Sequence, residues 1–418
     1  MNFDNSSVAP QVDAADRSLF HQRSFVLFWL ARMFSIIAFQ VCAVAVGWQV
    51  YELTGSAFNL GLVGLFQFLP MVILTLAAGH VADRYDRRAI ARVCQVTAGF
   101  AASMLALGSL NGGLHVAGIF GAVALVGAAR SFEHPTLAAL LPGLVTPKVL
   151  PKAAAITSSA IQTAFIIGPA LGGFLYAGGP AVPYTIAALL YFLAGLFSGM
   201  IRLERAPDRS KSAGFRSVFT GISYIRSQPV VLGAISLDLF AVLLGGATAL
   251  LPIFARDILH TGSWGLGVLR SSPAAGALTM SVVLARRPLS RKVGYIMFGA
   301  VMVFGLATTV FALSSSMILS VCALMTLGGA DVFSVVIRMT LVQLATPDAL
   351  RGRVSAVNSL FVGTSNQLGE FESGATAALF GPIPAVLIGG IGTIAVAMIW
   401  MYLFPALRKI DRLDSAQT

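Results

Sequence analysis

The sequence predicts an all-α polytopic membrane protein with twelve transmembrane helices in two six-helix halves. Three observations support this fold class: a composition poor in charge, twelve long apolar segments, and short patterns that recur in both halves. Hydrophobic residues make up 57% of the 418 residues and charged residues 11%, whereas a soluble domain carries about 25% charged residues. This composition excludes a soluble enzyme, a disordered protein and a fibrous repeat.

Each apolar segment is close to the roughly 20 residues that a helix needs to cross a bilayer. Charge clusters and Gly or Pro breaks separate the segments, which run over 24–51, 58–82, 89–109, 114–141, 153–177, 181–201, 229–255, 264–285, 293–314, 316–344, 354–380 and 383–407. They divide the chain into a cytoplasmic leader, an N-terminal half, a cytoplasmic linker, a C-terminal half and a cytoplasmic tail, over 1–23, 24–203, 204–228, 229–407 and 408–418. The leader has no short apolar core before a cleavage site, so it does not resemble a signal peptide.

The net charge of +11 follows from the positions of the basic residues. Of the 28 Lys and Arg residues, 23 stand in the N-terminal segment, in every second loop after it, or in the C-terminal tail; four lie within spans and the opposite loops hold Arg256 alone. This asymmetry follows the positive-inside rule, with both termini in the cytoplasm. Membrane topology therefore explains the basic balance, and no nucleic-acid partner is expected.

Two short patterns recur in corresponding places of the two halves. The Thr-Pro pair at 146–147 recurs at 346–347, and the Thr-Gly-Ser run at 54–56 recurs at 261–263. The first pattern follows the fourth and tenth spans, and the second follows the first and seventh. Two six-span halves in the same sense resemble the parallel-repeat plan of the major facilitator fold, whose site lies between the halves near the midplane.

The loop after the second span reads Gly-His-Val-Ala-Asp-Arg-Tyr-Asp-Arg-Arg over 79–88. It resembles the loop signature of the major facilitator superfamily, carried here by Gly79, Asp83, Arg84, Arg87 and Arg88. Asp83 and Arg87 are four residues apart and can pair at a helix end. The resemblance implies a latch between the halves on the cytoplasmic side; the simpler interpretation is a plain basic loop.

The fifth span contains Gly-Pro-Ala-Leu-Gly-Gly at 168–173. Gly168, Pro169, Gly172 and Gly173 match a signature of the drug:proton antiporter branch of the superfamily. Gly168 and Gly172 share a helical face that permits close packing, and Pro169 favours a bend. The signature favours export over uptake; ordinary packing of small residues is the alternative.

Two runs in the second half complete a more specific resemblance. Arg-Gly-Arg-Val-Ser-Ala-Val-Asn at 351–358 and Leu-Gly-Glu-Phe-Glu-Ser-Gly at 368–374, with the motifs at 54–56 and 79–88, resemble the enterobactin-exporter-like branch of the superfamily. The resemblance covers about residues 20–405. It implies proton-driven export of a small molecule, siderophore- or drug-like, across a bacterial inner membrane by a monomer without a cofactor. The substrate itself does not follow from a shared fold.

Charged side chains at membrane depth are costly and mark functional sites by default. The candidates for proton coupling or for lining the cavity are Asp238, Asp331, Glu370, Glu372, Arg32, Arg130, Glu133, His134 and Arg338. Spacing places Arg130, Glu133 and His134 on one face, which permits an internal arginine–carboxylate pair. Glu370 and Glu372 point about 200° apart around their helix, so only one can face a given cavity.

A carboxylate held away from water prefers its neutral form and can exchange protons near neutrality. Asp238, Asp331 and Glu370 are the preferred coupling residues on this ground. Structural ion pairs with Arg32, Arg130 or Arg338 are the alternative. Aromatic and methionine side chains would suit a bulky aromatic substrate where they line the cavity, although most are expected to face lipid or neighbouring helices. They include Phe34, Phe39, Trp48, Phe66, Phe68, Phe165 and Met339.

Several function classes lack their motifs in this sequence. No nucleotide-binding loop, HExxH or GxSxG is present, and the three cysteines stand in apolar runs that favour buried, inert thiols. We therefore expect no enzyme, metal site or cofactor. The leading hypothesis is a proton-driven exporter. An uptake transporter of the same fold and a non-transporting sensor or assembly partner remain as alternatives.

Overall fold

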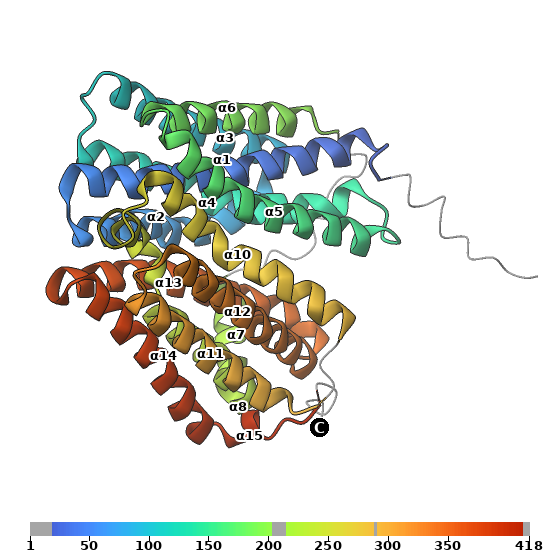
Figure 1. Cartoon of the computed structure of the whole chain (residues 1–418). Coiled ribbons are helices and arrows are strands. Elements are labelled where there is room, and N and C mark those ends of the chain that lie inside the picture. Colours follow the sequence, from blue (N-terminus) through green and yellow to red (C-terminus); the bar gives the residue numbers. More distant parts are fainter. Residues whose placement is uncertain (1–18, 203–214, 288–290, 413–418) are drawn as a thin grey trace, which may run out of the picture.

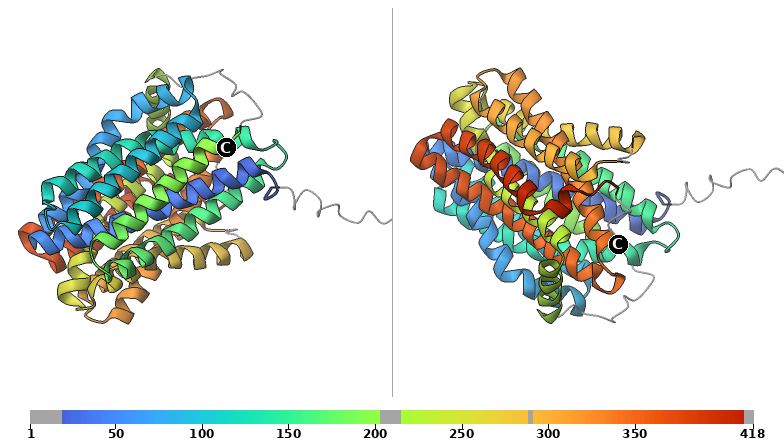
Figure 2. Two further views of the ribbon diagram at one scale, coloured as in Figure 1. Left: turned by 90° about the horizontal axis from the view of Figure 1, so that it is seen from above. Right: turned by 90° about the horizontal axis from the view of Figure 1, so that it is seen from below.

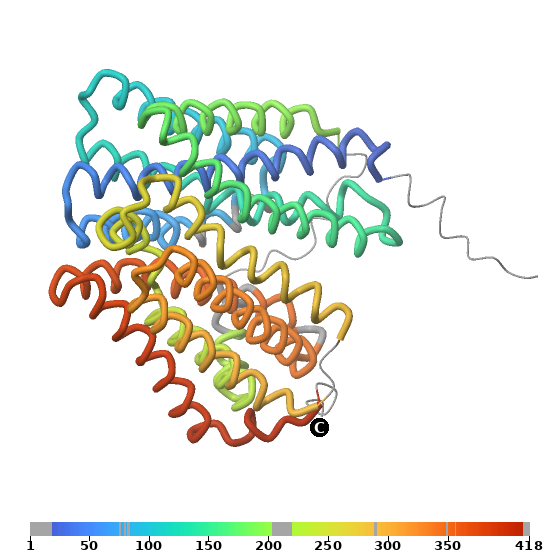
Figure 3. The backbone as a smooth tube through the Cα atoms, in the orientation of Figure 1, coloured from blue at the N-terminus to red at the C-terminus, as the bar shows by residue number. Residues whose placement is uncertain are grey.

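The computed structural model describes residues 19–202, 215–287 and 291–412, and all regular elements in these residues are helices. The trace in Figure 3 follows the first half from blue to green and the second from yellow-green to red. The first half consists of α1 (Arg23–Thr54), α2 (Ala57–Arg84), α3 (Arg87–Leu110), α4 (Val116–Leu144), α5 (Leu150–Tyr176) and α6 (Ala181–Met200). These six helices match the first six predicted spans.

The second half begins with a helix inside the segment predicted as a polar linker, α7 (Phe215–Ser227). It continues with α8 (Pro229–Leu244), η1 (Ala247–Leu250), α9 (Leu251–Ile253), η2 (Phe254–Ile258), α10 (Gly262–Arg286), α11 (Val293–Leu313), α12 (Met317–Ala345), α13 (Asp348–Phe380), α14 (Pro382–Leu403) and α15 (Pro405–Arg408). The predicted leader lies largely outside the described residues.

The seventh predicted span, 229–255, corresponds to the apolar segment Pro229–Ile258, but this segment is not one continuous helix. α8 ends at Leu244, and the chain then passes through a 3₁₀ turn, a short α-helical turn and the π-helical η2. Two consecutive glycines, Gly245 and Gly246, stand at the break. A Cβ on Gly246 would lie 2.5 Å from the carbonyl carbon of Gly369 in α13, so the close approach of these backbones requires glycine.

Eleven described helical segments are long and apolar enough to cross a membrane. The eleventh predicted span, 354–380, corresponds to α13, a helix of 33 residues that is not among these eleven segments. α13 packs in the bundle against α2 and α8. Asn358, Ser365 and Ser373 of α13 are buried in this bundle, and the all-α fold of two helical halves is confirmed.

The equivalent turns of the two halves share a backbone conformation. Gly55, between α1 and α2, has φ 58°, and Gly262, the first residue of α10, has φ 72°. Positive φ is readily adopted by glycine and rarely by other residues. The recurring Thr-Gly-Ser pattern thus encodes the same turn in both halves.

The two halves approach each other closely at one end and diverge at the other, and the views in Figure 2 show their helices running in a common direction (Figures 1 and 2). We call the end with the turns at 55–56, 111–115 and 177–180 the turn end, and the end with Leu19, Arg202 and Arg412 the linker end. Across the halves, α5 packs against α10 and α2 packs against α13. A Cβ on Gly173 would lie 2.8 Å from the Cα of Gly267, and one on Gly374 would lie 2.5 Å from the Cα of Gly61.

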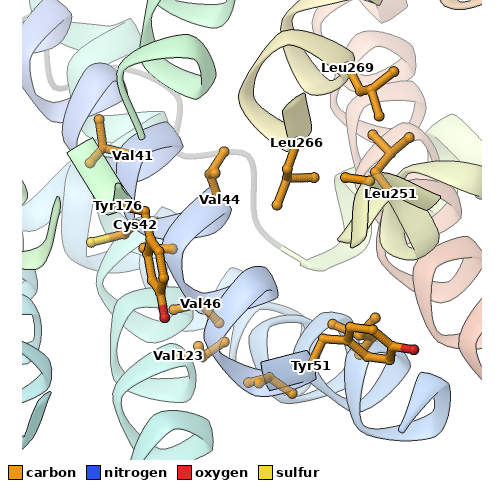
Figure 4. Close-up of a cluster of buried hydrophobic side chains, with 14 of the residues drawn as sticks. Val41, Cys42, Val44, Val46, Tyr51, Val123, Tyr176, Leu251, Leu266 and Leu269 are labelled. Carbon is orange, nitrogen blue, oxygen red and sulfur yellow. The ribbon is translucent and has the colours of Figure 1, made fainter. Parts of the chain in front are cut away.

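The largest buried cluster crosses between the halves near the turn end. Val41, Val44 and Tyr51 of α1 belong to the same cluster as Leu251 and Leu266 (Figure 4). Lipid tails are as apolar as leucine, so close packing of small residues and polar contacts, rather than escape from water, hold membrane helices together. The glycine contacts between α5 and α10 and between α2 and α13 fit this requirement.

Many large apolar side chains are exposed, as expected for helices that face lipid. Ile318, Leu379 and Tyr402 are 77%, 79% and 84% exposed. The cysteines differ from one another: Cys42 and Cys94 are buried, but Cys322 is exposed. The expectation of three buried thiols is therefore wrong for Cys322, which stands in an apolar run that faces outward.

Candidate functional site

A cavity of about 510 Å³ lies between the two halves at mid-depth. Its walls come from α1, α2, α3, α4 and α5 of the first half and from η1, α9, α10 and α13 of the second. Because both halves contribute, a bound molecule would contact each of them. This is the location in which the parallel-repeat plan places a substrate site.

Three of the nine ionisable residues predicted from the sequence line this cavity, namely Arg130, His134 and Glu370. The structure adds Arg270 of α10, which the sequence placed inside a span but which was not among the predicted site residues. Two arginines from opposite halves thus face a space that one carboxylate shares. The spacing signal for Arg270 was weak, because no acid stands three or four residues away on its own helix.

Both arginines are held against neutral groups of α1. The guanidinium of Arg130 lies 3.7 Å from the ring centroid of Phe39. Nη1 of Arg270 donates a hydrogen bond of 3.2 Å to the carbonyl oxygen of Ala43, across the interface between the halves. Neither contact neutralises the positive charge, so both side chains can still pair with an anion.

Glu370 reaches the cavity where α13 meets a glycine of α2. A Cβ on Gly64 would lie 2.9 Å from the Cβ of Glu370 and 3.0 Å from its Oε2. The missing side chain at Gly64 therefore leaves the space that the carboxylate occupies. Glu372, two residues on, does not line the cavity and accepts a hydrogen bond of 2.8 Å from Thr376 Oγ1.

The remaining lining of the cavity is aromatic, aliphatic and amide. Phe39 and Phe165 contribute rings, and Gln40, Gln67, Asn366 and Gln367 contribute amides. Oε1 of Gln367 is buried and has no hydrogen-bond partner. An unpaired buried acceptor is costly, so this oxygen is available for a donor on a bound molecule.

Asp238 and Arg338 lie outside this cavity, within the second half. Arg338 of α12 forms an ion pair with Asp238 of α8, and the two side chains are only 4% and 5% exposed. Asp331 lies beside this pair: it and Asp238 line a small pocket of about 10 Å³ between α8, α11 and α12. That volume is near the minimum for one water molecule.

Glu133 and Arg32 also lie outside the cavity, in the first half. Glu133 Oε1 accepts hydrogen bonds from Ser35 Oγ at 2.6 Å and from Gln95 Nε2 at 3.0 Å. Arg32 acts on Glu133 electrostatically. The expected pair between Arg130 and Glu133 is absent from the ion pairs of the described residues, because Glu133 turns toward neutral donors on α1 and α3 while Arg130 turns toward Phe39.

A set of polar contacts at the turn end escaped the sequence reasoning. Tyr51 of α1 donates a hydrogen bond to Asp257 of η2, across the halves. The guanidinium of Arg256 lies 5.6 Å from the centroid of the Tyr51 ring. Within the first half, Tyr176 donates a hydrogen bond of 2.7 Å to Glu52 Oε2. The two members of the first contact are separated by more than two hundred residues, so no local pattern could have revealed it.

Part of the predicted latch lies at the linker end, between α2 and α3. The structure describes the backbone of Gly79 and Asp83 within α2 but not the side chain of Asp83, and Arg84 is exposed. Nη1 of Arg87 donates to the carbonyl of Ala139 at 3.0 Å, so it contacts α4 within the same half.

Asp86 stands in the turn between α2 and α3, directly before the first residue of α3. Asp86 accepts from the backbone N–H of Arg88 at 3.0 Å and forms an ion pair of 2.8 Å with its guanidinium. The hydrogen bond from Arg88 holds the pKa of the Asp86 carboxyl below its ordinary value. Asp86, which was not among the predicted site residues, therefore caps α3.

The glycines of the predicted antiporter signature lie at two helix contacts. A Cβ on Gly168 would lie 2.6 Å from the Cβ of Gln40, and one on Gly172 would lie 3.0 Å from the carbonyl oxygen of Val41. Gly173 faces α10 instead. Pro169 stands inside α5, which continues as one helix to Tyr176.

Comparison with known proteins agrees with this architecture. The chain matches the family described as transmembrane secretion effector over residues 15–418. It is 26% identical over 387 residues to the enterobactin exporter EntS of Citrobacter koseri, covering 92% of this chain and 93% of that protein. It is 25% identical over 396 residues to EntS of Escherichia coli (strain SMS-3-5 / SECEC), covering 94% and 95%.

The fold is shared with solved transporters at lower identity. A crystal structure of a mutant of the nucleoside transporter NupG superposes with a TM-score of 0.73 and 14% identity, covering 91% of this chain and all of that one. The cavity thus lies between the two helical halves of a fold that solved membrane transporters share. The chain belongs to the transmembrane secretion effector family of the major facilitator superfamily.

Proposed function

We propose that this protein exports an anionic, aromatic small molecule of the siderophore type by alternating access. The observation that carries the proposal is the pair Arg130 and Arg270, which face one cavity from opposite halves. An anion held between them would contact both halves at once. Such bridging contacts change when the halves rock, so the ligand can bias the conformational equilibrium.

The neutral lining favours the same class of ligand. Phe39 and Phe165 offer ring faces for stacking, and the unpaired Oε1 of Gln367 offers an acceptor for a ligand hydroxyl. An aromatic acid with ring hydroxyls would use all three kinds of contact. The relatives named enterobactin exporter support a siderophore-like substrate.

We propose export because the signature at 168–173 favours it and because the relatives are named exporters. The basic residues of the alternate loops place the linker end in the cytoplasm by the positive-inside rule. In this arrangement the halves are closed at the outer, turn end and diverge at the cytoplasmic end, as a substrate-loading state of an exporter requires. We place the protein in the bacterial inner membrane and expect one chain to suffice, because a single chain supplies both walls of the cavity.

We propose that protons drive the export through carboxylates of the second half. Asp238, Asp331 and Glu370 stay the candidates, and their surroundings separate their roles. Asp238 has Arg338 as its partner, whereas Asp331 has no ion pair or hydrogen bond among the described residues. Asp331 is partly buried, and no direct ion pair among the described residues offsets its carboxylate, which makes it the strongest candidate.

Two further elements of the cycle are proposed from the motifs. The segment at 79–88 acts as a latch between the halves at the cytoplasmic end. The glycines Gly168, Gly172 and Gly173 with Pro169 allow α5 to move against α1 and α10, because their backbones meet with few intervening side chains. Both proposals concern motion between states, and each is tested by transport.

The test is transport into everted membrane vesicles with a panel of siderophores, aromatic acids and cationic dyes. We expect accumulation of anionic aromatic compounds that depends on a proton gradient. An Arg130→Gln or Arg270→Gln variant, inserted normally, should lose most of this accumulation because a charged hydrogen bond contributes about 1.5–3 kcal/mol. Accumulation of cationic dyes alone would contradict the proposal.

A further inference from the structure

The cavity contains a single carboxylate among its described lining residues, Glu370. Apart from the Cys42 thiol, the other acid–base and charged groups of the lining are Arg130, Arg270 and His134. With a neutral His134, the lining carries one net positive charge when Glu370 is ionised and two when it is protonated. The proton on Glu370 therefore sets the field that a charged ligand meets.

The charge of Glu370 affects ligand binding because the other charged groups of the cavity lie around it. From α10, Arg270 acts on it electrostatically without forming a direct ion pair among the described residues. From α4, Arg130 and His134 stand on the other half of the same cavity. The cavity-lining residues of α2 and η1 are uncharged, with Gly64 of α2 in direct contact.

We propose that Glu370 is a charge-selectivity residue and that its protonation and the binding of an anionic ligand strengthen each other. The ligand and the Glu370 carboxylate compete for the same cation, Arg270. When an anion takes Arg270, the carboxylate loses its counter-charge in a site of low dielectric and takes up a proton. Because coupling between two ligands is reciprocal, the proton raises the affinity for the anion by the same factor. This inference rests on the proposed anionic substrate.

The sign of this coupling has a consequence for transport. Exchange requires that the proton and the substrate exclude one another, whereas two ligands that favour each other move together. With this sign of coupling, Glu370 binds its proton together with the anion, so of the three candidate carboxylates it is not the one that exchanges protons for an exported anion. That role falls to a carboxylate outside the cavity, and Asp331 beside the Asp238–Arg338 pair occupies such a position.

The experiment uses two probes that differ in charge, 2,3-dihydroxybenzoate and 2,3-dihydroxybenzamide. Their binding to the purified protein in lipid nanodiscs is measured by calorimetry in two buffers of different ionisation enthalpy, which counts the protons exchanged. For the unmodified protein near neutral pH we expect the benzoate to bind with proton uptake, and its affinity to rise as the pH falls. The benzamide should bind more weakly, with little uptake.

Three variants assign the proton. Glu370→Gln should bind the benzoate on the order of 10-fold more tightly at pH 8, a coupling within the usual range, and should lose the proton uptake. Glu372→Gln, on the same helix but outside the cavity, should behave as the unmodified protein. His134→Gln should keep the proton uptake, because this variant removes the imidazole of His134 and retains the Glu370 carboxyl that takes up the proton.

The outcomes separate the two proposals. Proton release on benzoate binding to the unmodified protein, or weaker benzoate binding by Glu370→Gln, would overturn the role of Glu370, as would loss of uptake in His134→Gln. Equal affinity for the benzoate and the benzamide, or no binding of either, would overturn the anionic substrate itself. The measurement on the unmodified protein decides the sign of the coupling even if Glu370→Gln fails to fold.

Discussion

Arg338 on α12 and Asp238 on α8 form an ion pair that is almost fully buried inside the second half. The two residues are one hundred positions apart, and each is the other's direct ionic partner among the described residues. Removing one member of a buried pair leaves an uncompensated charge, which costs about 3–5 kcal/mol, while replacing both by neutral groups is often tolerated. Removing one member of the pair is therefore expected to lower the stability of the folded protein before any effect on transport.

Asp238→Asn should lower the melting temperature and the yield of folded protein, because it strands the Arg338 guanidinium. The double variant Asp238→Asn, Arg338→Gln should recover most of the loss. Thermal unfolding of the purified proteins in detergent, followed by fluorescence size-exclusion chromatography, measures both. A single variant as stable as the double variant would show that Arg338 finds another partner.

Asp331→Asn should abolish uphill, gradient-driven efflux and spare downhill counterflow. The variant removes a proton site but leaves the cavity and the Asp238–Arg338 pair in place. Uphill transport and counterflow are measured side by side in proteoliposomes, with Glu372→Gln as the control that keeps both activities. If Asp331→Asn retains gradient-driven efflux, the coupling site lies elsewhere, and the cluster of Arg130, Glu133 and His134 becomes the next candidate.

The sequence predicted the helices well because each span carries its own signal of length and apolarity. It did not predict the break inside the seventh span, where apolar residues continue past Leu244 although α8 ends there. That break depends on the backbone of Gly369 in α13, which no local pattern contains. α13 was found in spite of its polar residues, because its helical span is bounded by Pro347 and Gly381.

The residue types of the candidate site could be predicted from the sequence. Which of these residues lie together could not. Rarity of charge within spans singled out Glu370, Arg130 and Asp238, but not which of them share a cavity. The side chain of Arg270 donates a hydrogen bond to the backbone of Ala43, which belongs to the other half of the chain. Such partners depend on how the halves pack, and one sequence gives only the spacing within each helix.

The topology predicts opposite labelling at two positions. A single cysteine at Gly112, in the turn after α3, should react with a membrane-impermeant maleimide in intact cells, and one at Ser212 should not. The background must lack the native cysteines, above all Cys322, which is exposed. Reaction of Ser212→Cys from outside would reverse the orientation, and disrupted cells serve as the control that both positions can react.

The latch predicts that Asp83→Asn impairs transport while insertion and folding remain intact. A charge contact that differs between the alternating states biases their equilibrium, and its removal changes the rate of the cycle. Transport is compared at equal surface expression. Asp86→Asn is the matched control, because Asp86 pairs with Arg88 within the α2–α3 turn and should affect helix capping more than the cycle. Normal transport by Asp83→Asn would contradict the latch, and the segment at 79–88 would then be a plain basic loop.

Tyr51→Phe should open the turn end by removing the hydrogen bond from Tyr51 to Asp257, which crosses the halves. A hydrogen bond to a charged group contributes about 1.5–3 kcal/mol when buried, and Asp257 is half exposed, so we expect a several-fold shift in population. Spin labels at Leu53 and Trp264, both exposed and on opposite halves, report the change as a longer distance by pulsed electron resonance. Tyr176→Phe is the matched control: its hydroxyl bonds Glu52 within the first half, so its loss should leave the distance unchanged. An equal response of the two variants would mean that lost packing, and not the contact between the halves, governs closure.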